Sequence, residues 1–248
     1  MKKLKLRYKI ILGLFIIILI SIAILAVWLL NYYKATDEAV ELIKREVSIK
    51  VTEENWLVFS SSKKESRTGV IFYPGARVEA KAYAPLAFEI AEEGYQVVIV
   101  PMPLNLAVFG INKADVLMET YPEIENWLIA GHSLGGTMAS RYANNNAHKL
   151  KGLVLLASYP AESDNLSNKE LAVLSVYASR DGLISLETIE ESRELLPQKT
   201  KWVEIDGGNH SQYGYYGFQS GDKEAEISRG QQQQEIVAAV INFLETVL

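Results

Sequence analysis

The sequence contains no cysteine among its 248 residues. This absence excludes disulfide bonds, thiolate zinc sites and a cysteine nucleophile. A strong excess of positive charge is also missing. With 25 basic and 30 acidic residues, the net charge is −5, which argues against nucleic acid as the main partner. The 22% of charged residues excludes a multi-span membrane protein. The length suits one globular domain with a sizeable core.

Charge is missing altogether from residues 10–30, almost all of which are Ile, Leu, Val, Ala, Phe or Trp. As a helix, 21 residues extend about 30 Å, which matches the hydrocarbon core of a bilayer. Five basic residues precede the run, and Trp28 and Tyr32 at its far end suit an interfacial aromatic belt. The pattern predicts a single-pass signal anchor over residues 1–34, which contacts the lipid bilayer through residues 10–30. The rest of the chain then lies outside the cytoplasmic membrane.

A cleaved signal peptide is the alternative interpretation of this segment. Such peptides usually have an apolar core of about 7 to 15 residues and a small-residue cleavage site. The run here is longer, and Ala23 and Ala26 do not form an A-x-A site. The sequence therefore favours a retained anchor, although it does not decide between the two.

Beyond the anchor, the pattern predicts a short charged stalk over residues 35–47 and one domain over residues 48–248. The domain begins with a predicted antiparallel hairpin and continues with apolar strands that alternate with amphipathic helices. This alternation indicates an α/β fold with a mainly parallel central sheet flanked by helices. We expect strands at 69–73, 95–100, 126–130, 150–158, 171–179 and 200–206, and helices at 78–94, 113–121, 134–145, 186–196 and 231–248.

Residues 131–135 read Gly-His-Ser-Leu-Gly, between a predicted strand and a predicted helix. This G-x-S-x-G pattern is typical of a nucleophile elbow, in which the serine sits on a strained turn above the sheet. Side chains at the flanking positions would clash with the adjacent strand and helix, and glycine removes them. The motif alone is weak, but its position between strand and helix makes Ser133 the predicted nucleophile.

In chain order, the acid and then the histidine follow such a serine. Of three histidines, His132 lies inside the elbow and His148 near a solvated helix end, so His210, in a loop after the last strand, is the predicted base. Asp181 follows the penultimate strand and is the predicted acid, which would hold the imidazole tautomer. The competing carboxylates are Asp206, Asp164 and Glu162.

A developing oxyanion needs two backbone N–H donors. One is expected from Leu134, directly after the nucleophile and at a helix N-terminus. The other is expected from the loop that follows residues 69–73, where Gly75 allows close approach and either Ala76 or Arg77 would donate. Ala76 is the preferred donor. Arg77 could instead attract an anionic group of the substrate or simply be solvated.

These residues resemble the α/β-hydrolase superfamily, and more narrowly its small cap-less branch around dienelactone hydrolase, called α/β-hydrolase family 5. The motifs that carry the resemblance are FYPGARVEAKAYAPLA, VPMPLNLAVFG, GHSLGG, LVLLASYPA, SRDGL and GGNHSQYGYYG. The resemblance implies an α/β-hydrolase fold, Ser133 as nucleophile, Asp181 as acid, His210 as base, and Leu134 and Ala76 as oxyanion donors. Dienelactone hydrolases carry a cysteine nucleophile, and this chain has none, which puts that specific activity in doubt.

Only 12 residues, 159–170, separate the strand after the elbow helix from the next strand. This is too short for a helical cap, so we expect an open site. The aromatic segment after His210 could form an apolar wall against an acyl or aryl group, through Tyr213, Tyr215 and Tyr216. These tyrosines could equally cover the edge of the sheet.

The sequence as a whole predicts a membrane-anchored serine hydrolase that cleaves an ester or related acyl bond of a small molecule, with no metal ion and no cofactor. Two alternatives stay open: a catalytically idle hydrolase fold that serves as a binding module, and an acyltransferase with the same triad. Six basic and no acidic residues fall in residues 1–34, which leaves 19 basic and 30 acidic residues, a net −11, for residues 35–248.

Overall fold

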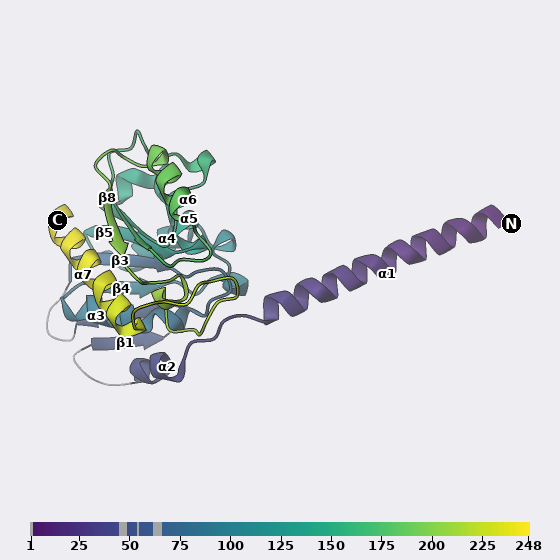
Figure 1. Cartoon of the computed structure of the whole chain (residues 1–248), viewed down its shortest axis with the longest axis horizontal. Helices are drawn as coiled ribbons and strands as arrows, with labels where there is room; N and C mark the ends of the chain where they lie inside the picture. Colours follow the sequence, from purple (N-terminus) through teal and green to yellow (C-terminus); the bar gives the residue numbers. More distant parts are fainter. Residues whose placement is uncertain (1, 45–48, 54, 62–65) are drawn as a thin grey trace. The chain divides into compact units, whose positions relative to one another are not determined.

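The computed structural model of the chain (Figure 1) describes residues 2–44, 49–53, 55–61 and 66–248. The chain divides into two compact units, residues 1–32 and residues 33–248. The first unit is helix α1 (Lys2–Leu30). Its segment Tyr8–Trp28 has a mean hydropathy of 3.4 and none of it is buried inside the structure. By length and composition this helix can cross a membrane, and a signal sequence would have the same character.

The second unit is built on one eight-stranded sheet with the order β1-β2-β4-β3-β5-β6-β7-β8. Strands β1 and β2 form the antiparallel hairpin that the sequence predicts, and the six strands from β4 to β8 along the sheet run parallel. The fold class is therefore confirmed. The strands are β1 (Ile49–Glu53), β2 (Leu57–Ser61), β3 (Thr68–Tyr73), β4 (Gln96–Ile99), β5 (Asn126–His132), β6 (Gly152–Leu156), β7 (Ala172–Ala178) and β8 (Lys201–Ile205).

Helices cover both faces of this sheet, which is why its central strands carry runs of consecutive apolar residues. In β3, Val70 and Phe72 pack into one core, while Ile71 and Tyr73 pack into the core on the other face. Helices α3 and α7 cover the first face and α4 and α5 the second (Figure 1). The helices of this unit are α2 (Asp37–Lys44), α3 (Ala84–Glu92), α4 (Lys113–Thr120), α5 (Leu134–Asn146), α6 (Leu186–Glu191) and α7 (Arg229–Val247).

Two expectations need correction. The helix predicted over 78–94 begins at Ala84, because residues 80–83 form a 3₁₀ helix and Pro85 occupies the first turn of α3. A proline is well tolerated there, since its missing N–H would have no partner within the helix.

The predicted stalk is also wrong over its described part. Helix α2 packs against α3, and its Ala39 is fully buried. The chain therefore joins the folded unit at Tyr33 rather than at residue 48. Residues 45–47, the end of that predicted stalk, lie outside the described residues.

Candidate active site

The strand–turn–helix of the G-x-S-x-G motif is present as the sequence predicts. Ser133 lies between β5 and α5 with φ 51° and ψ −126°, a conformation that costs a non-glycine residue energy. Its backbone is held from several sides: its N–H donates to the Leu156 carbonyl at 3.0 Å, and its carbonyl accepts from Ser158 Oγ at 2.7 Å. The surrounding structure thus fixes a strained turn that lifts the Ser133 hydroxyl above the end of β5.

The glycines of the motif have separate steric reasons. A Cβ on Gly131 would overlap the backbone of Gly135, across the turn. A Cβ on Gly135 would overlap the backbone carbonyl of Tyr73, at the end of β3. Helix α5 therefore starts in direct contact with the neighbouring strand, which is possible only without side chains at these two positions.

The structure brings Asp181 and His210 together. Asp181 follows β7 and His210 follows β8, and because the strands are parallel their carboxyl ends meet at one edge. His210 Nδ1 lies 2.8 Å from Asp181 Oδ2, and both side chains are buried. The other carboxylate oxygen accepts the backbone N–H groups of Leu183 and Ile184, both at 2.8 Å. Since an ionised carboxylate only accepts, Nδ1 carries the proton of a neutral His210 ring.

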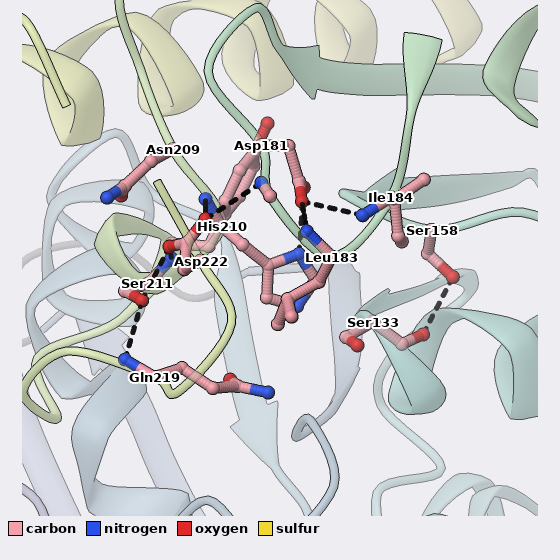
Figure 2. A network of polar contacts seen from close by, with 12 residues as sticks. Ser133, Ser158, Asp181, Leu183, Ile184, Asn209, His210, Ser211, Gln219 and Asp222 are labelled. Atoms are coloured by element: carbon pink, nitrogen blue, oxygen red, sulfur yellow. Dashed lines mark hydrogen bonds and ion pairs between the residues drawn. The ribbon is translucent and has the colours of Figure 1, made fainter. Parts of the chain in front are cut away.

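The second ring nitrogen of His210 remains available. Nε2 is buried and has no hydrogen-bond partner among the described residues. The His210 ring lies 4.5 Å, centroid to centroid, from the ring of His132, the last residue of β5. This contact holds the base loop against the strand that leads to Ser133, and Figure 2 shows the serine, the acid and the histidine with their polar contacts.

The loop after β3 leaves one backbone N–H unused. Gly75 donates its N–H to Tyr83 Oη at 3.0 Å, and Arg77 donates its own to the Asn105 carbonyl at 2.7 Å. Between them, the N–H of Ala76 has no acceptor among the described residues. Leu134 is the first residue of α5, where the N–H has no acceptor within the helix. Among the described residues, both predicted oxyanion donors are thus backbone N–H groups without an acceptor.

His132, inside the elbow, has a structural role. Burial lowers the pKa of His132 well below its ordinary value, and the neighbouring His210 lowers this pKa further. Burial raises the pKa of Tyr83, so its hydroxyl keeps its proton. With 2.9 Å between Tyr83 Oη and His132 Nδ1, the tyrosine donates and the neutral histidine accepts. The same hydroxyl accepts from Gly75, so Tyr83 connects the β3 loop to the elbow strand.

Sequence reasoning missed Asp222, which joins the acid loop to the base loop (Figure 2). Its Oδ1 accepts the N–H of Gly182, next to Asp181, at 2.9 Å. Its Oδ2 accepts from Ser211, next to His210, both the N–H at 2.7 Å and the hydroxyl at 2.6 Å. Asp222 lies in a polar segment, Ser-Gly-Asp-Lys-Glu, whose composition is typical of a solvated loop. No local pattern distinguishes this aspartate from one that faces water.

Gln232 was missed as well. Its fully buried side chain accepts the N–H of Asn209 at 2.9 Å and donates to the Asn209 carbonyl at 2.8 Å. In the sequence Gln232 is one of four consecutive glutamines at the start of the helix predicted over 231–248, and nothing there indicates this role. In the structure this side chain replaces a backbone partner for the residue that precedes His210.

The structure corrects the prediction that Tyr213 and Tyr216 form an apolar wall against the substrate. Tyr213 and Tyr216 are fully buried, and their hydroxyls donate to the carbonyls of Val176 and His210 at 3.2 and 3.3 Å. These two tyrosines therefore pack beneath the base loop rather than face a ligand. Tyr215 is partly exposed and lies under the guanidinium of Arg229, 5.2 Å from the ring centroid.

The competing candidates lie elsewhere. Asp164 is paired with Arg141 at 2.9 Å, and Asp206 is exposed and accepts from Ser179 Oγ at 3.1 Å. Glu162 and His148 are exposed. Within the described part of the chain, no group of three or more His, Asp or Glu side chains is arranged to hold a metal ion. Residues 157–171, all of them described, contain one short 3₁₀ helix and no cap.

Comparison with known proteins agrees with this geometry. The model of the alpha/beta hydrolase family matches residues 69–234. The chain belongs to the alpha/beta hydrolase family. A protein of Mycobacterium phage D29 named as a non-heme haloperoxidase is 26% identical to this hydrolase over 122 residues. The match covers 45% of this chain and 44% of the phage protein, so the hydrolase spans less than half the length of that relative.

Two solved structures show the same fold. A monoacylglycerol lipase from Paleococcus ferrophilus superposes with a TM-score of 0.59 at 14% identity, over 77% of this chain and 100% of the lipase. A dienelactone hydrolase from Anabaena variabilis superposes with a TM-score of 0.58 at 15% identity, over 79% of this chain and 95% of that enzyme. The predicted fold and the family resemblance are confirmed.

Proposed function

We propose that this hydrolase is a membrane-anchored serine esterase that acts through an acyl-enzyme. The observation that carries the proposal is the buried Asp181–His210 pair, whose Nε2 has no partner among the described residues, at the same carboxyl edge of the sheet as a serine on a strained turn (Figure 2). An unsatisfied buried polar atom costs about 1–3 kcal/mol. Nε2 of the structural His132 is also buried without a partner among the described residues, but His210 differs because its Nδ1 lies on the Asp181 carboxylate. A nitrogen reserved for the Ser133 proton explains this orphaned acceptor.

The reaction then has two halves. Ser133 Oγ attacks the ester carbonyl carbon while His210 Nε2 takes its proton, and the carbonyl oxygen becomes an oxyanion held by the N–H groups of Leu134 and Ala76. The carbon–oxygen bond of the ester breaks, and His210 returns the proton to the leaving alcohol. Water, deprotonated by His210, attacks the acyl-enzyme, and the carboxylic acid leaves as Ser133 regains its proton.

Asp181 contributes orientation and charge. Its carboxylate holds His210 with Nε2 toward the serine and stabilises the imidazolium that forms in each half. The ester class is further supported by structural neighbours named as a lipase and as a dienelactone hydrolase. Helix α1, which carries five basic residues at its amino end, supports an anchor with the catalytic unit on the extracytoplasmic side.

A fluorophosphonate probe tests the nucleophile directly. We expect the wild-type chain to be labelled and Ser133→Ala to lose labelling completely. Ser185→Ala, which removes an exposed hydroxyl at the start of α6, is the matched control and should label like the wild type. Equal labelling of wild type and Ser133→Ala would refute the assignment, and ester formation with an added alcohol acceptor would instead identify an acyltransferase.

A further inference from the structure

The chain enters the catalytic unit on the loop that carries the proposed oxyanion donor. Tyr33 forms a parallel bridge to Val78, donates its N–H to the Arg77 carbonyl at 2.7 Å, and accepts the N–H of Glu79 at 2.9 Å. Its ring lies 5.8 Å from that of Tyr216, and its hydroxyl accepts the N–H of Ser220 at 3.3 Å. The first residue of the unit is therefore attached both to the β3 loop and to the segment that follows the base.

Only Asn31 and Tyr32 separate this attachment from the end of α1 at Leu30. Three peptide steps span at most about 11 Å. If α1 crosses a bilayer, Tyr33 lies within the headgroup region or directly beside it. Covalent connectivity alone then keeps the loop around Ala76 close to the lipid surface.

The loops at the same edge of the sheet also expose large apolar side chains. We call Leu104, Phe109, Leu183 and Phe218 the apolar rim; their exposed fractions are 55%, 59%, 38% and 50%. They follow the carboxyl ends of β4, β7 and β8.

Each loop of the rim is bonded to a residue beside the proposed machinery. The carbonyl of Asn105, next to Leu104, accepts from Arg77. Leu183 donates its N–H to Asp181. The N–H of Gln219, next to Phe218, donates to Ser211 Oγ at 2.9 Å. A contiguous exposed apolar patch marks contact with lipid or a partner, and these four side chains lie on loops that are bonded to the proposed site.

We infer that the apolar rim rests on the bilayer and that the site takes acyl esters dissolved in the lipid phase. The inference rests on the proposed esterase function and names its substrate class. A water-soluble ester does not need the rim, whereas an ester with a long acyl chain must leave the bilayer to reach Ser133. A rim in contact with lipid shortens the path from the bilayer to Ser133 and keeps the acyl chain of the substrate away from water.

The amino edge of the sheet, opposite the apolar rim, provides a control position and a second surface that could contact the membrane instead of the rim. Leu248, 54% exposed, borders a cavity at the amino ends of β3 and β4. A second cavity, at the amino ends of β6 to β8, is lined by Lys151, Lys169, Lys199 and Lys201. These lysines could attract anionic headgroups, which would turn the proposed site away from the membrane.

The first experiment measures lipid contact without relying on catalysis. The full chain has no cysteine, so single cysteines at Phe109→Cys, Phe218→Cys, Leu248→Cys and Lys199→Cys can each carry one nitrobenzoxadiazole label in phosphatidylglycerol–phosphatidylethanolamine nanodiscs. We expect blue-shifted emission, quenched by doxyl-labelled lipid, at 109 and 218 only. Rim labels that behave like the label at 248, or quenching at 199 instead, would overturn the inference.

The second experiment compares two esters with one leaving group. 4-Methylumbelliferyl oleate in vesicles of the same lipids reports on lipid-phase substrate, and 4-methylumbelliferyl acetate in water reports on the catalytic groups. The triple variant Leu104→Ser, Phe109→Ser and Phe218→Ser should lose at least tenfold on oleate and less than twofold on acetate, while Leu248→Ser changes neither. An equal loss on both esters, or no loss on oleate, refutes the lipid role. Failure of Ser133 to label with fluorophosphonate instead refutes the esterase itself.

Discussion

Asp222→Asn is the sharpest test of how the site is held together. The carboxylate accepts from Gly182 through one oxygen and from the N–H and hydroxyl of Ser211 through the other. An asparagine has one acceptor oxygen and one NH₂ group. Whichever way the amide is placed, its NH₂ faces backbone N–H donors on one of the two loops, so the connection between the acid loop and the base loop is broken.

The size of the effect follows from the number of bonds lost. A hydrogen bond to a charged group contributes about 1.5–3 kcal/mol. Either placement of the amide loses two such bonds, those from Gly182 and Lys223 or those from the N–H and hydroxyl of Ser211. Because the carboxylate is only half-buried, we expect the free energy of unfolding to fall by about 2–4 kcal/mol rather than by the full sum. Small displacements of catalytic groups are costly, so kcat should fall by about 10- to 100-fold with little change in KM.

The assay pairs urea denaturation with hydrolysis of a water-soluble ester. Asp206→Asn is the control, because Asp206 is exposed and accepts one bond from Ser179 Oγ in the same region. We expect it to change the free energy of unfolding by less than about 0.5 kcal/mol and kcat by less than twofold. If Asp222→Asn behaves like this control, the carboxylate does not position the acid and the base.

Two further substitutions probe the elbow. Gly135→Ala should prevent correct folding of the elbow and abolish activity, because its Cβ would overlap the Tyr73 carbonyl. The control is Gly230→Ala in α7, where a Cβ meets open space, so that this variant should be more stable than the wild type by up to about 1 kcal/mol. Thermal unfolding followed by circular dichroism compares the two variants. His132 is held neutral when folded and binds a proton below pH 6.5 when unfolded, so its contribution to stability is present above pH 6.5 and lost as the pH falls. Between pH 6.5 and 5.5 the wild type should lose up to about 1.4 kcal/mol more than His132→Gln in urea denaturation, and equal losses would contradict the assignment.

The elements that could be predicted from the sequence are those whose reasons are local. Strands β3, β5 and β6 are apolar at consecutive positions because both faces are covered, so their runs of Val, Ile and Leu are visible without a structure. The elbow is visible because glycine is required on both sides of Ser133. The closeness of Asp181 and His210 can be predicted because the parallel sheet brings the carboxyl ends of β7 and β8 to the same edge.

The residues that hold the site could not be predicted, because their partners are distant in sequence. Asp222 contacts Gly182 across 40 residues, and Gln232 contacts Asn209 across 23. Neither pair of residues is close enough in sequence to form a recognisable motif. The same applies to Tyr213 and Tyr216, since an aromatic segment after the base has the same composition whether it lines a pocket or packs beneath the loop. The sequence predicts a stalk in place of helix α2 because the charged residues of this helix are visible in the sequence, while the surface that buries Ala39 is not.

Charge determines what kind of membrane contact the catalytic unit can make. Residues 35–248 carry a net charge of −11, and anionic headgroups repel such a unit within a Debye length of about 8–10 Å. Electrostatic attraction therefore cannot hold the whole unit against an anionic bilayer. The lipid contact that we propose would instead rely on the covalent link at Tyr33 and on burial of apolar side chains. Both occur at the carboxyl edge of the sheet, on loops that also carry Asp181, His210 and Ala76. The carboxyl edge of the sheet is thus both the part of the unit best suited to lipid contact and the part at which an acyl chain would reach the proposed nucleophile.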